Sequence, residues 1–284
     1  MPEGDTVWRS AHLLDRALRG GVITRFDLRV PQVATADLTG QTVRESVSRG
    51  KHLLLRTSGG STLHTHLKME GEWLVLRPGA RWPKPAFRAR AVVATATAEA
   101  VGFDLGLVEL LPGTPEHPAD ESAAVGHLGP DPLNDDPFDA AAAARGILQD
   151  PRPIHVALQD QRHVAGFGNE YANELLFLRG IHPRTPASEV DAAKLIDLGV
   201  RTIRLNRDRP VRSFTGDTRR GRGNWVYGRA RQPCRRCGTV IQTGMLGADP
   251  TRERTVFWCP HCQPMPAGTG DGTGDGTGDG TDRA

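Results

Sequence analysis

The sequence begins MPEGDTVW, and its second and third residues could carry out covalent chemistry. If Met1 is removed after synthesis, Pro2 presents a secondary α-amine with the carboxylate of Glu3 beside it. An amine next to an acid is a possible site for Schiff-base formation with a carbonyl carbon. The same residues are also an ordinary start to a chain, since proline suits the position just before a helix, where no backbone N–H is needed. Taken alone, these residues leave both interpretations open.

Four cysteines near the C-terminus form two Cys-x-x-Cys pairs, Cys234 with Cys237 and Cys259 with Cys262. Residues 238–258, between the pairs, contain strand-forming stretches, VIQT before a turn and TVFW after it. Two such pairs can close a tetrahedral thiolate site, and a short hairpin with little core of its own needs such a link. We therefore predict one structural Zn²⁺, which would shape a binding surface and leave no coordination position for a substrate. Redox-active cysteine pairs are the alternative.

Further candidates are polar residues beside elements that could present them to a phosphate group. Asn169 begins a helix after a glycine-containing turn, where free backbone N–H groups form a natural phosphate seat. Glu174, one turn later, is equally explained as a buried hydrogen-bond partner. Arg254 near the hairpin tip could bring a guanidinium to a phosphate, or serve only as a solubilising charge. Lys51 stands at the start of an apolar strand, HLLLRT, where it could bind a ligand or merely keep the end of the strand from pairing with another chain.

The charge of the chain is distributed unevenly. The formal net charge is +3, but residues 201–236 contain twelve arginines against only Asp208 and Asp217, so this segment carries about +10 and the remainder about −7. Such an asymmetry indicates that one part of the molecule binds a polyanion, and a solvated arginine-rich loop is the alternative. No signal-like start and no apolar stretch of about 18 residues is found. We therefore expect a soluble, cytoplasmic protein with no membrane partner.

The pattern of apolar residues divides the chain into parts. Residues 5–19 predict a helix, and the short apolar runs between residues 22 and 111 predict an antiparallel β-sandwich or barrel. A stretch crowded with Pro, Gly and Asp follows, and then several helical patterns, the last with Ser188 as its expected N-cap. We predict an α+β fold with a catalytic domain, an interdomain linker, a helical domain, a zinc hairpin and a disordered Gly/Thr/Asp tail, at residues 1–112, 113–139, 140–228, 229–263 and 264–284.

Several motifs occur together in one order along the chain: MPEG, SRGKHLL, HLKMEGEW, GFGNEYANELLF, WVYGR, PCRRCG and FWCPHC. In this order and spacing the sequence resembles the formamidopyrimidine-DNA glycosylase and endonuclease VIII family, from residue 1 to about residue 263. The resemblance implies an N-terminal antiparallel β-sandwich flanked by helices, followed by a helix-two-turn-helix DNA-binding domain with a zinc β-hairpin. It also implies a bifunctional DNA glycosylase and abasic-site lyase of base excision repair. Its partner would be damaged double-stranded DNA, bound by a monomer.

The resemblance assigns a role to each candidate residue. Pro2 would be the nucleophile whose amine attacks C1′ of the damaged nucleotide, and Glu3 the acid and base that assists sugar-ring opening and departure of the base. The resulting iminium acidifies the C2′ proton, so that successive β- and δ-eliminations cut the strand on both sides of the sugar. Lys51 would assist the eliminations and contact phosphate, while Arg254 and Asn169 would bind the phosphates that flank the lesion.

A second group of residues is expected at the DNA surface. The target base must leave the stack before the amine can reach C1′, and the gap must be filled while the DNA is bent. Met69 matches the family's void-filling position, and Lys68 and His127 align with positions near DNA. The arginine-rich segment would add nonspecific phosphate affinity that weakens steeply with salt.

Two departures from the family pattern accompany the resemblance. Asp5 stands where the family usually has proline, and the hairpin between the cysteine pairs is lengthened around LGADP. The MPEG start and the arginine-rich stretch look more like the endonuclease VIII branch, which favours oxidised pyrimidines such as thymine glycol. The alternatives are the branch that excises 8-oxoguanine and formamidopyrimidines, a noncatalytic zinc-containing DNA-binding protein, and a Schiff-base enzyme of small-molecule metabolism.

Overall fold

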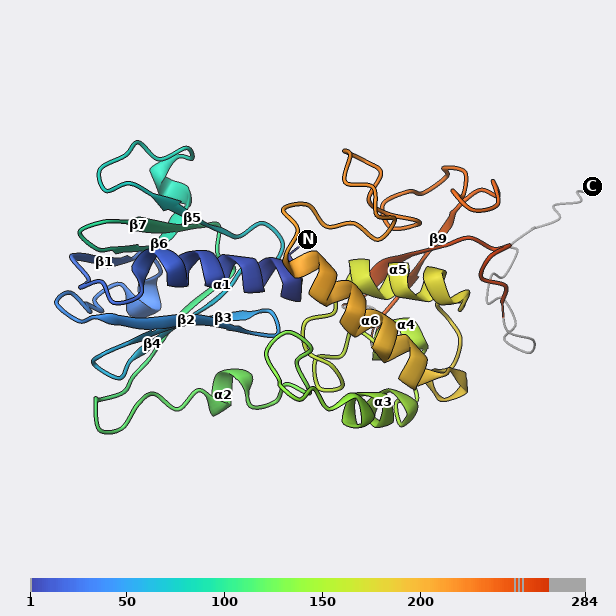
Figure 1. Ribbon diagram of the computed structural model, residues 1–284, viewed down its shortest axis with the longest axis horizontal. Helices are drawn as coiled ribbons and strands as arrows, with labels where there is room; N and C mark the ends of the chain where they lie inside the picture. Colours follow the sequence, from blue (N-terminus) through green and yellow to red (C-terminus); the bar gives the residue numbers. More distant parts are fainter. Residues whose placement is uncertain (1, 248, 250, 252, 266–284) are drawn as a thin grey trace, which may run out of the picture.

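The first half of the chain forms two sheets that face each other. In the computed structural model, which describes residues 2–247, 249, 251 and 253–265, both sheets have four strands and every pair of neighbours is antiparallel (Figure 1). One sheet has the order β1-β6-β7-β5 and the other β2-β3-β4-β8, which confirms the expected antiparallel sandwich. The strands are β1 (Arg25–Leu28), β2 (Val43–Arg49), β3 (His52–Thr57), β4 (Thr62–His66), β5 (Glu72–Leu76), β6 (Ala89–Ala94), β7 (Glu99–Phe103) and β8 (Leu107–Leu111).

An apolar core fills the space between the sheets, and helix α1 (Gly4–Leu18) completes it. The inward side of α1 carries apolar residues at intervals of three and four, which is the spacing of one helical face: Val7, Ala11, Leu14 and Leu18. They pack with Leu53 and Leu55 of β3 and with Ala91 and Val93 of β6. The prediction of a helix over residues 5–19 is confirmed to within one residue at each end.

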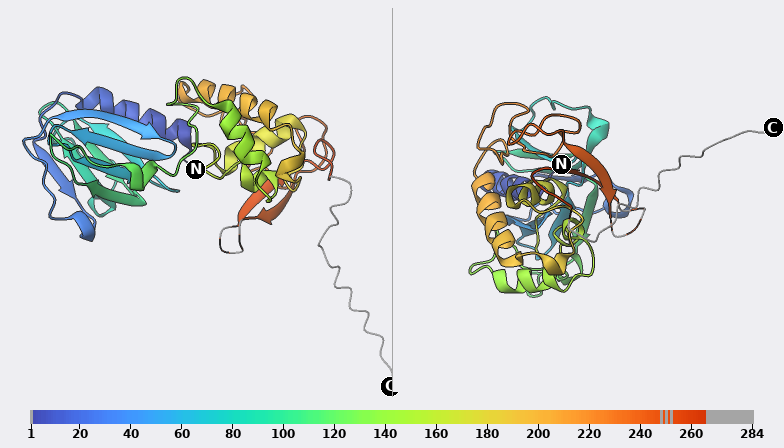
Figure 2. Two further views of the ribbon diagram at one scale, coloured as in Figure 1. Left: turned by 90° about the horizontal axis from the view of Figure 1, so that it is seen from below. Right: turned by 90° about the vertical axis from the view of Figure 1, so that its right-hand side faces the viewer.

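The second half is mostly helical and has an apolar core of its own. The helices are α2 (Ser122–Val125), α3 (Ala140–Leu148), α4 (Ile154–Ala157), α5 (Asn169–Arg179) and α6 (Ala192–Arg207), with a 3₁₀ turn at Ala187–Glu189 (η3). The turns η1 (Pro31–Val33) and η2 (Ala86–Arg88) belong to the first half. Helix α1 of the first half packs against α6, so the two cores adjoin side by side (Figure 2). The domain bounds assigned from the sequence stay predictions. Within the described ranges, none of the helices combines the length and apolar composition that a bilayer crossing requires.

A two-stranded hairpin follows, made of β9 (Gln242–Leu246) and β10 (Arg254–Trp258). A hairpin between the cysteine pairs is therefore confirmed, but its first strand begins two residues later than VIQT predicts. The reason is that Val240 and Ile241 pair with the preceding segment, Val240 opposite Pro233 and Ile241 donating to the Gln232 carbonyl at 2.9 Å. The predicted tail lies outside the described residues from residue 266 onward.

Helix α6 begins later than its sequence pattern predicts. Asp191 is the N-cap, and its side chain accepts a hydrogen bond from the backbone N–H of Lys194 at 3.1 Å. The prediction of Ser188 as the N-cap is wrong, because Ser188 lies in the turn η3. Val190, between the two, has an extended backbone that separates the turn from the helix.

Asp191→Ala and Ser188→Ala form a matched test of this cap. Loss of the acceptor in Asp191→Ala should lower the free energy of unfolding by about 1 kcal/mol. Ser188→Ala should change it by less than about 0.5 kcal/mol, as at other exposed positions. Urea unfolding followed by circular dichroism measures both, and a larger loss in Ser188→Ala would contradict the assignment.

Candidate active site and metal centre

The N-terminal residues reach the second half of the chain and meet the start of α5 (Figure 1). The carboxylate of Glu3 is fully buried and accepts hydrogen bonds from the backbone N–H groups of Gly168 at 2.7 Å and Glu170 at 2.8 Å. It thereby satisfies donors that a helix N-terminus leaves free, and the helix dipole favours its negative charge. These contacts fix the half-buried Pro2, one residue earlier, at the junction of the two halves.

Lys51 joins Glu3 from the first half of the chain. It lies in the turn between β2 and β3, directly after Gly50, whose φ of +57° suits glycine and whose N–H donates to Asp131 at 2.7 Å. A Cβ atom on Gly168 would lie 2.7 Å from both Oε1 of Glu3 and Nζ of Lys51. The two charged groups therefore meet over Gly168, where only glycine leaves room for both.

Burial shifts these two groups in opposite directions. The loss of water around Glu3 raises the pKa of its carboxyl, although the positive charges of Arg212 and Lys51 oppose the shift. The loss of water around Lys51 lowers the pKa of its ammonium, while the charge of Glu3 acts the other way. A carboxyl with a raised pKa and an amine with a lowered one exchange protons at a smaller cost in free energy, which suits both to acid–base chemistry.

The start of α5 also holds the C-terminal hairpin in place. Asn169 donates from Nδ2 to the Thr255 carbonyl at 3.0 Å, and its Oδ1 lies 3.0 Å from Nε2 of His155. Asn173, one turn later, accepts a hydrogen bond from the Phe257 N–H at 2.6 Å. The sequence predicts that Asn169 binds a phosphate. In the structure both its Nδ2 and its Oδ1 form hydrogen bonds inside the protein, and the bond to Thr255 positions β10.

Arg254 is the first residue of β10 and directly precedes the carbonyl that Asn169 holds. Its side chain is exposed, with one hydrogen bond to the Glu253 carbonyl at 3.3 Å. Its positive charge adds to the effect of burial in lowering the pKa of Lys51. The structure therefore brings Arg254 within electrostatic reach of Lys51 despite the lengthened hairpin.

The residues expected at the DNA surface lie near the ends of β3 and β4. Met69 is 62% exposed in the turn between β4 and β5, as a side chain that enters DNA must be. The His127 ring lies 6.1 Å from the ring of His52, which directly follows Lys51 in the chain. Burial lowers the pKa of His52 to about 4, and the charges of His127 and Lys68 add to that shift. Lys68 and His127 therefore lie close enough to His52, the residue after Lys51, for their charges to act on it.

Sequence reasoning missed an ion-pair cluster next to Glu3. Asp5 is fully buried and pairs with Arg212, which also pairs with Glu170 in the first turn of α5. The sequence carried one signal of this cluster, the acid at position 5 in place of proline. Its partner lies 207 positions later in the chain, where no local pattern marks it.

Glu174 anchors residues 225–227, which lie within the arginine-rich segment. Its buried carboxylate accepts the backbone N–H groups of Trp225, Val226 and Tyr227 at 2.8, 2.9 and 2.7 Å. Burial raises the pKa of Glu174 to about 7, while these three donors act in the opposite direction. Its interpretation as a buried hydrogen-bond partner is therefore confirmed.

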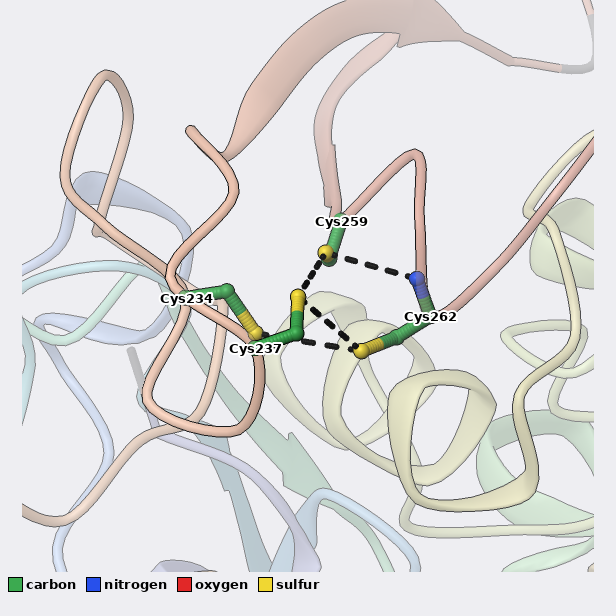
Figure 3. A group of neighbouring side chains, drawn as sticks. All are labelled: Cys234, Cys237, Cys259 and Cys262. Carbon is green, nitrogen blue, oxygen red and sulfur yellow. Dashed lines mark hydrogen bonds between the residues drawn. The ribbon is translucent and has the colours of Figure 1, made fainter.

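The four cysteines meet at the base of the hairpin (Figure 3). Their Sγ atoms lie within 4.8 Å of one another: Cys237 is 3.4 Å from Cys259 and 3.5 Å from Cys262, and Cys234 is 4.0 Å from Cys262. All four are free thiols. Tetrahedral zinc with Zn–S bonds of about 2.3 Å places its sulfurs about 3.8 Å apart. The donor set and its spacing therefore fit a single zinc ion.

Two family models match the chain. The formamidopyrimidine-DNA glycosylase N-terminal domain matches residues 1–104, which contain α1 and β1 to β7. The formamidopyrimidine-DNA glycosylase H2TH domain matches residues 128–204, which contain α3 to α5 and most of α6. The fold and the site thus define a DNA-repair glycosylase with a helix-two-turn-helix domain.

Curated relatives match over nearly the whole length. "Probable endonuclease 8 2" of Streptomyces coelicolor is 48% identical over 94% of this chain and 95% of its own. "DNA-(apurinic or apyrimidinic site) lyase Nei2" of Mycolicibacterium smegmatis is 47% identical over 93% and 99%. "Formamidopyrimidine-DNA glycosylase" of Heliobacterium modesticaldum is 31% identical over 93% and 99%. The chain belongs to the formamidopyrimidine-DNA glycosylase and endonuclease VIII family. It is a DNA glycosylase and abasic-site lyase of DNA repair.

Solved structures share the fold. Lactococcus lactis Fpg in a complex with abasic-site DNA aligns with a TM-score of 0.74 at 23% identity, over 93% of this chain and 100% of that chain. MutM in a complex with carbocyclic 8-oxo-G DNA aligns with the same TM-score of 0.74 and 23% identity. These likenesses confirm the predicted architecture of a sandwich followed by a helical domain.

Gly168→Ala tests whether Glu3 and Lys51 must meet at this glycine. The new methyl group would overlap both side chains, and a displacement of about 1 Å can reduce a rate about 100-fold, so we expect a loss of that size. Single-turnover cleavage of a duplex with one abasic site measures it. Gly244→Ala is the control, because its Cβ would be in ordinary contact 3.4 Å from Trp258. Unchanged cleavage by folded Gly168→Ala would contradict the assigned site.

Proposed function

We propose that this enzyme excises oxidised pyrimidines and then cuts the strand, with the amine of Pro2 as its nucleophile. The observation that carries the proposal is the placement of the N-terminus. Glu3 is buried at the start of α5 and meets Lys51 over Gly168, so an amine one residue earlier lies beside an acid and a lysine. An N-terminal amine with a pKa of about 8 is already partly neutral at physiological pH, as a nucleophile must be.

The reaction would proceed through a covalent iminium. After removal of Met1, the Pro2 nitrogen attacks C1′ as the bond from C1′ to the base breaks, and the base leaves with a proton. Cleavage of the C1′–O4′ bond opens the sugar and yields the iminium, whose charge makes the C2′ proton acidic. Loss of that proton expels the 3′ phosphate, and a second elimination expels the 5′ phosphate. Hydrolysis of the iminium then frees the amine.

Glu3 and Lys51 would donate and accept the protons that these steps require. Because burial raises the pKa of Glu3, its carboxyl can hold a proton closer to neutral pH and donate it to O4′ as the ring opens. Because burial lowers the pKa of Lys51, its amine can accept a proton during the eliminations or, when charged, bind the phosphate that leaves.

Damaged duplex DNA is the proposed partner, bound by a monomer in the cytoplasm and on the nucleoid. Arg254 would bind a phosphate beside the lesion, and Asn169 would do so with the donor capacity left by its internal hydrogen bonds. Met69 would fill the gap, with Lys68 and His127 near the backbone. Most arginines of the predicted polyanion-binding segment are exposed and would add nonspecific contacts to the phosphates: Arg201, Arg204, Arg219, Arg220, Arg222, Arg231, Arg235 and Arg236.

Sequence identity supports oxidised pyrimidines over purine lesions. The chain is 48% identical to a relative named as an endonuclease 8 and 31% identical to one named as a formamidopyrimidine-DNA glycosylase. The arginine-rich segment points to the same branch.

Borohydride trapping tests the nucleophile, because reduction converts the iminium into a stable bond between protein and DNA. We expect the Met1-processed enzyme to be trapped on a duplex with one thymine glycol, and mass spectrometry of the adduct to place the DNA on Pro2. Protein that keeps an uncleaved N-terminal extension has no free Pro2 amine and should give no adduct.

Two further duplexes separate the remaining outcomes, one with 8-oxoguanine and one with a preformed abasic site. Stronger trapping on 8-oxoguanine would reassign the lesion class and leave the mechanism in place. No adduct on any of the three duplexes, despite tight DNA binding, would reject the lyase chemistry of Pro2.

We further propose that the four cysteines hold one structural Zn²⁺. Four thiolates close the coordination shell, so the ion would take no part in the reaction. It would hold the base of the hairpin that carries Arg254, where the apolar cluster around Cys234 and Cys259 is small.

Metal analysis should find one zinc per chain, and none in Cys237→Ser after chelation. We expect this variant to lose at least about tenfold in DNA affinity, because Arg254 is no longer held against α5, while the remaining secondary structure persists. Elemental analysis, fluorescence anisotropy and circular dichroism measure these effects. A metal-free protein with full DNA affinity would contradict the structural role.

A further inference from the structure

Three consecutive N-terminal residues contact the second half of the chain. Glu3 accepts the N–H groups at the start of α5, and Gly4 donates its own N–H to the Gly166 carbonyl at 2.9 Å. A Cβ on Gly4 would lie only 2.9 Å from the Gly166 Cα, so the two backbones touch. Asp5, the third residue, forms an ion pair with Arg212. The reaction proposed for Pro2 accounts for Glu3 but gives Asp5 no role.

The guanidinium of Arg212 joins the first turns of two helices. It donates from Nε to Asp5 Oδ2 at 2.8 Å and from Nη2 to Asp5 Oδ1 at 2.5 Å, a two-pronged contact that fixes orientation as well as distance. Its Nη1 donates to Glu170 Oε2 at 2.5 Å, and its carbon lies 5.2 Å from the centre of the Tyr171 ring. Asp5 belongs to α1, whereas Glu170 and Tyr171 belong to α5.

The direction of the N-terminus depends on the first turn of α1. Glu3 has an extended backbone, with φ of −127° and ψ of −174°, and the helix starts at the next residue. A rotation of that first turn would therefore swing Pro2 even if the Glu3 carboxylate stayed in place. Asp5 lies in this turn, and its side chain is 0% exposed against 10% for Arg212. The ion pair thus sets the orientation from which Pro2 extends.

We propose that Asp5 and Arg212 are positioning residues for the reaction, which hold the Pro2 amine at the angle that attack on C1′ requires. The inference rests on the proposed function of Pro2. Neither side chain needs to touch the DNA, since both act through the first turn of α1. Arg212, although part of the arginine-rich segment, would then serve the site from inside the protein and not as a phosphate ligand.

The apolar core makes it possible to separate this role from a purely structural one. Val7, Ala11 and Leu14 hold α1 against the sheets without help from the ion pair. Removal of one partner leaves an uncompensated buried charge and destabilises a protein strongly, whereas removal of both charges is often neutral for stability. A double variant can therefore recover the fold while the orientation of Pro2 stays unfixed.

Asp5→Asn, Arg212→Met and the double variant should be compared in single-turnover borohydride trapping on an abasic-site duplex at saturating enzyme. We expect the double variant, in which Glu170 still loses its partner Arg212, to recover only part of the thermal midpoint that the single variants lose and to bind the duplex as tightly as the wild type. Its trapping should still be slower by about tenfold or more, because a small error in the angle of attack is costly. DNA affinity, measured by anisotropy, separates binding from the chemical step.

Asp27→Asn with Arg25→Met is the matched control, because this pair on β1 lies outside the assigned site and its side chains are exposed at 33% and 43%. It should trap DNA at the wild-type rate. If the double variant does not fold, the trapping rate of Asp5→Asn is the test in its place, because Arg212 still pairs with Glu170 in that variant. A wild-type trapping rate in the folded variant would overturn the positioning role and leave Pro2 as nucleophile. No trapping by the wild type would instead overturn the chemistry of Pro2 itself.

Discussion

The bond between the Glu3 carboxylate and the first N–H groups of α5 is the constraint on which the site depends. It joins the start of the chain to Gly168, a residue 165 positions later. A buried carboxylate needs donors, and a helix N-terminus needs acceptors, so each satisfies what the other lacks. Because the first residues also begin α1, which belongs to the sandwich core, this bond fixes the two cores against each other and places Pro2 between them.

Several charged side chains are buried together at the junction of the two halves, and the burial of any one of them alone would be unfavourable. Glu3 and Lys51 meet over a glycine, and Arg212 lies between Asp5 and Glu170. Each charge is compensated by a neighbour, which makes burial tolerable, yet the loss of water still raises the pKa of Glu3 and lowers that of Lys51. Buried charges would be defects in an apolar core, but here they produce the shifted pKa values that suit the site to proton transfer.

Local patterns predicted the elements well, because they depend on residues close together in the sequence. Helix α1 followed from apolar spacing, and the cysteine cluster from the needs of one kind of ligand. Both Ser188 and Asp191 are good N-caps, and the extended backbone of Val190, which decides between them, is not visible in the sequence. The approach of Lys51 to the N-terminus came from family resemblance. The partner of Asp5 was missed, since tertiary packing alone brings Arg212 to it.

The burial of Glu3 also bears on the order of two events during synthesis, the removal of Met1 and the enclosure of the Glu3 carboxylate. The N-terminus leaves the ribosome long before α5 exists, and an aminopeptidase can then reach Met1 without obstruction. Once residues 168–170 have been made and have folded, the Glu3 carboxylate is enclosed and Pro2 is half-buried at the junction. Under the proposed mechanism, Met1 would therefore be removed from the nascent chain before the Glu3 carboxylate is enclosed. In the proposed mechanism the nucleophilic amine is thus available early, whereas the acid beside it is enclosed only after the chain has been made past residue 170.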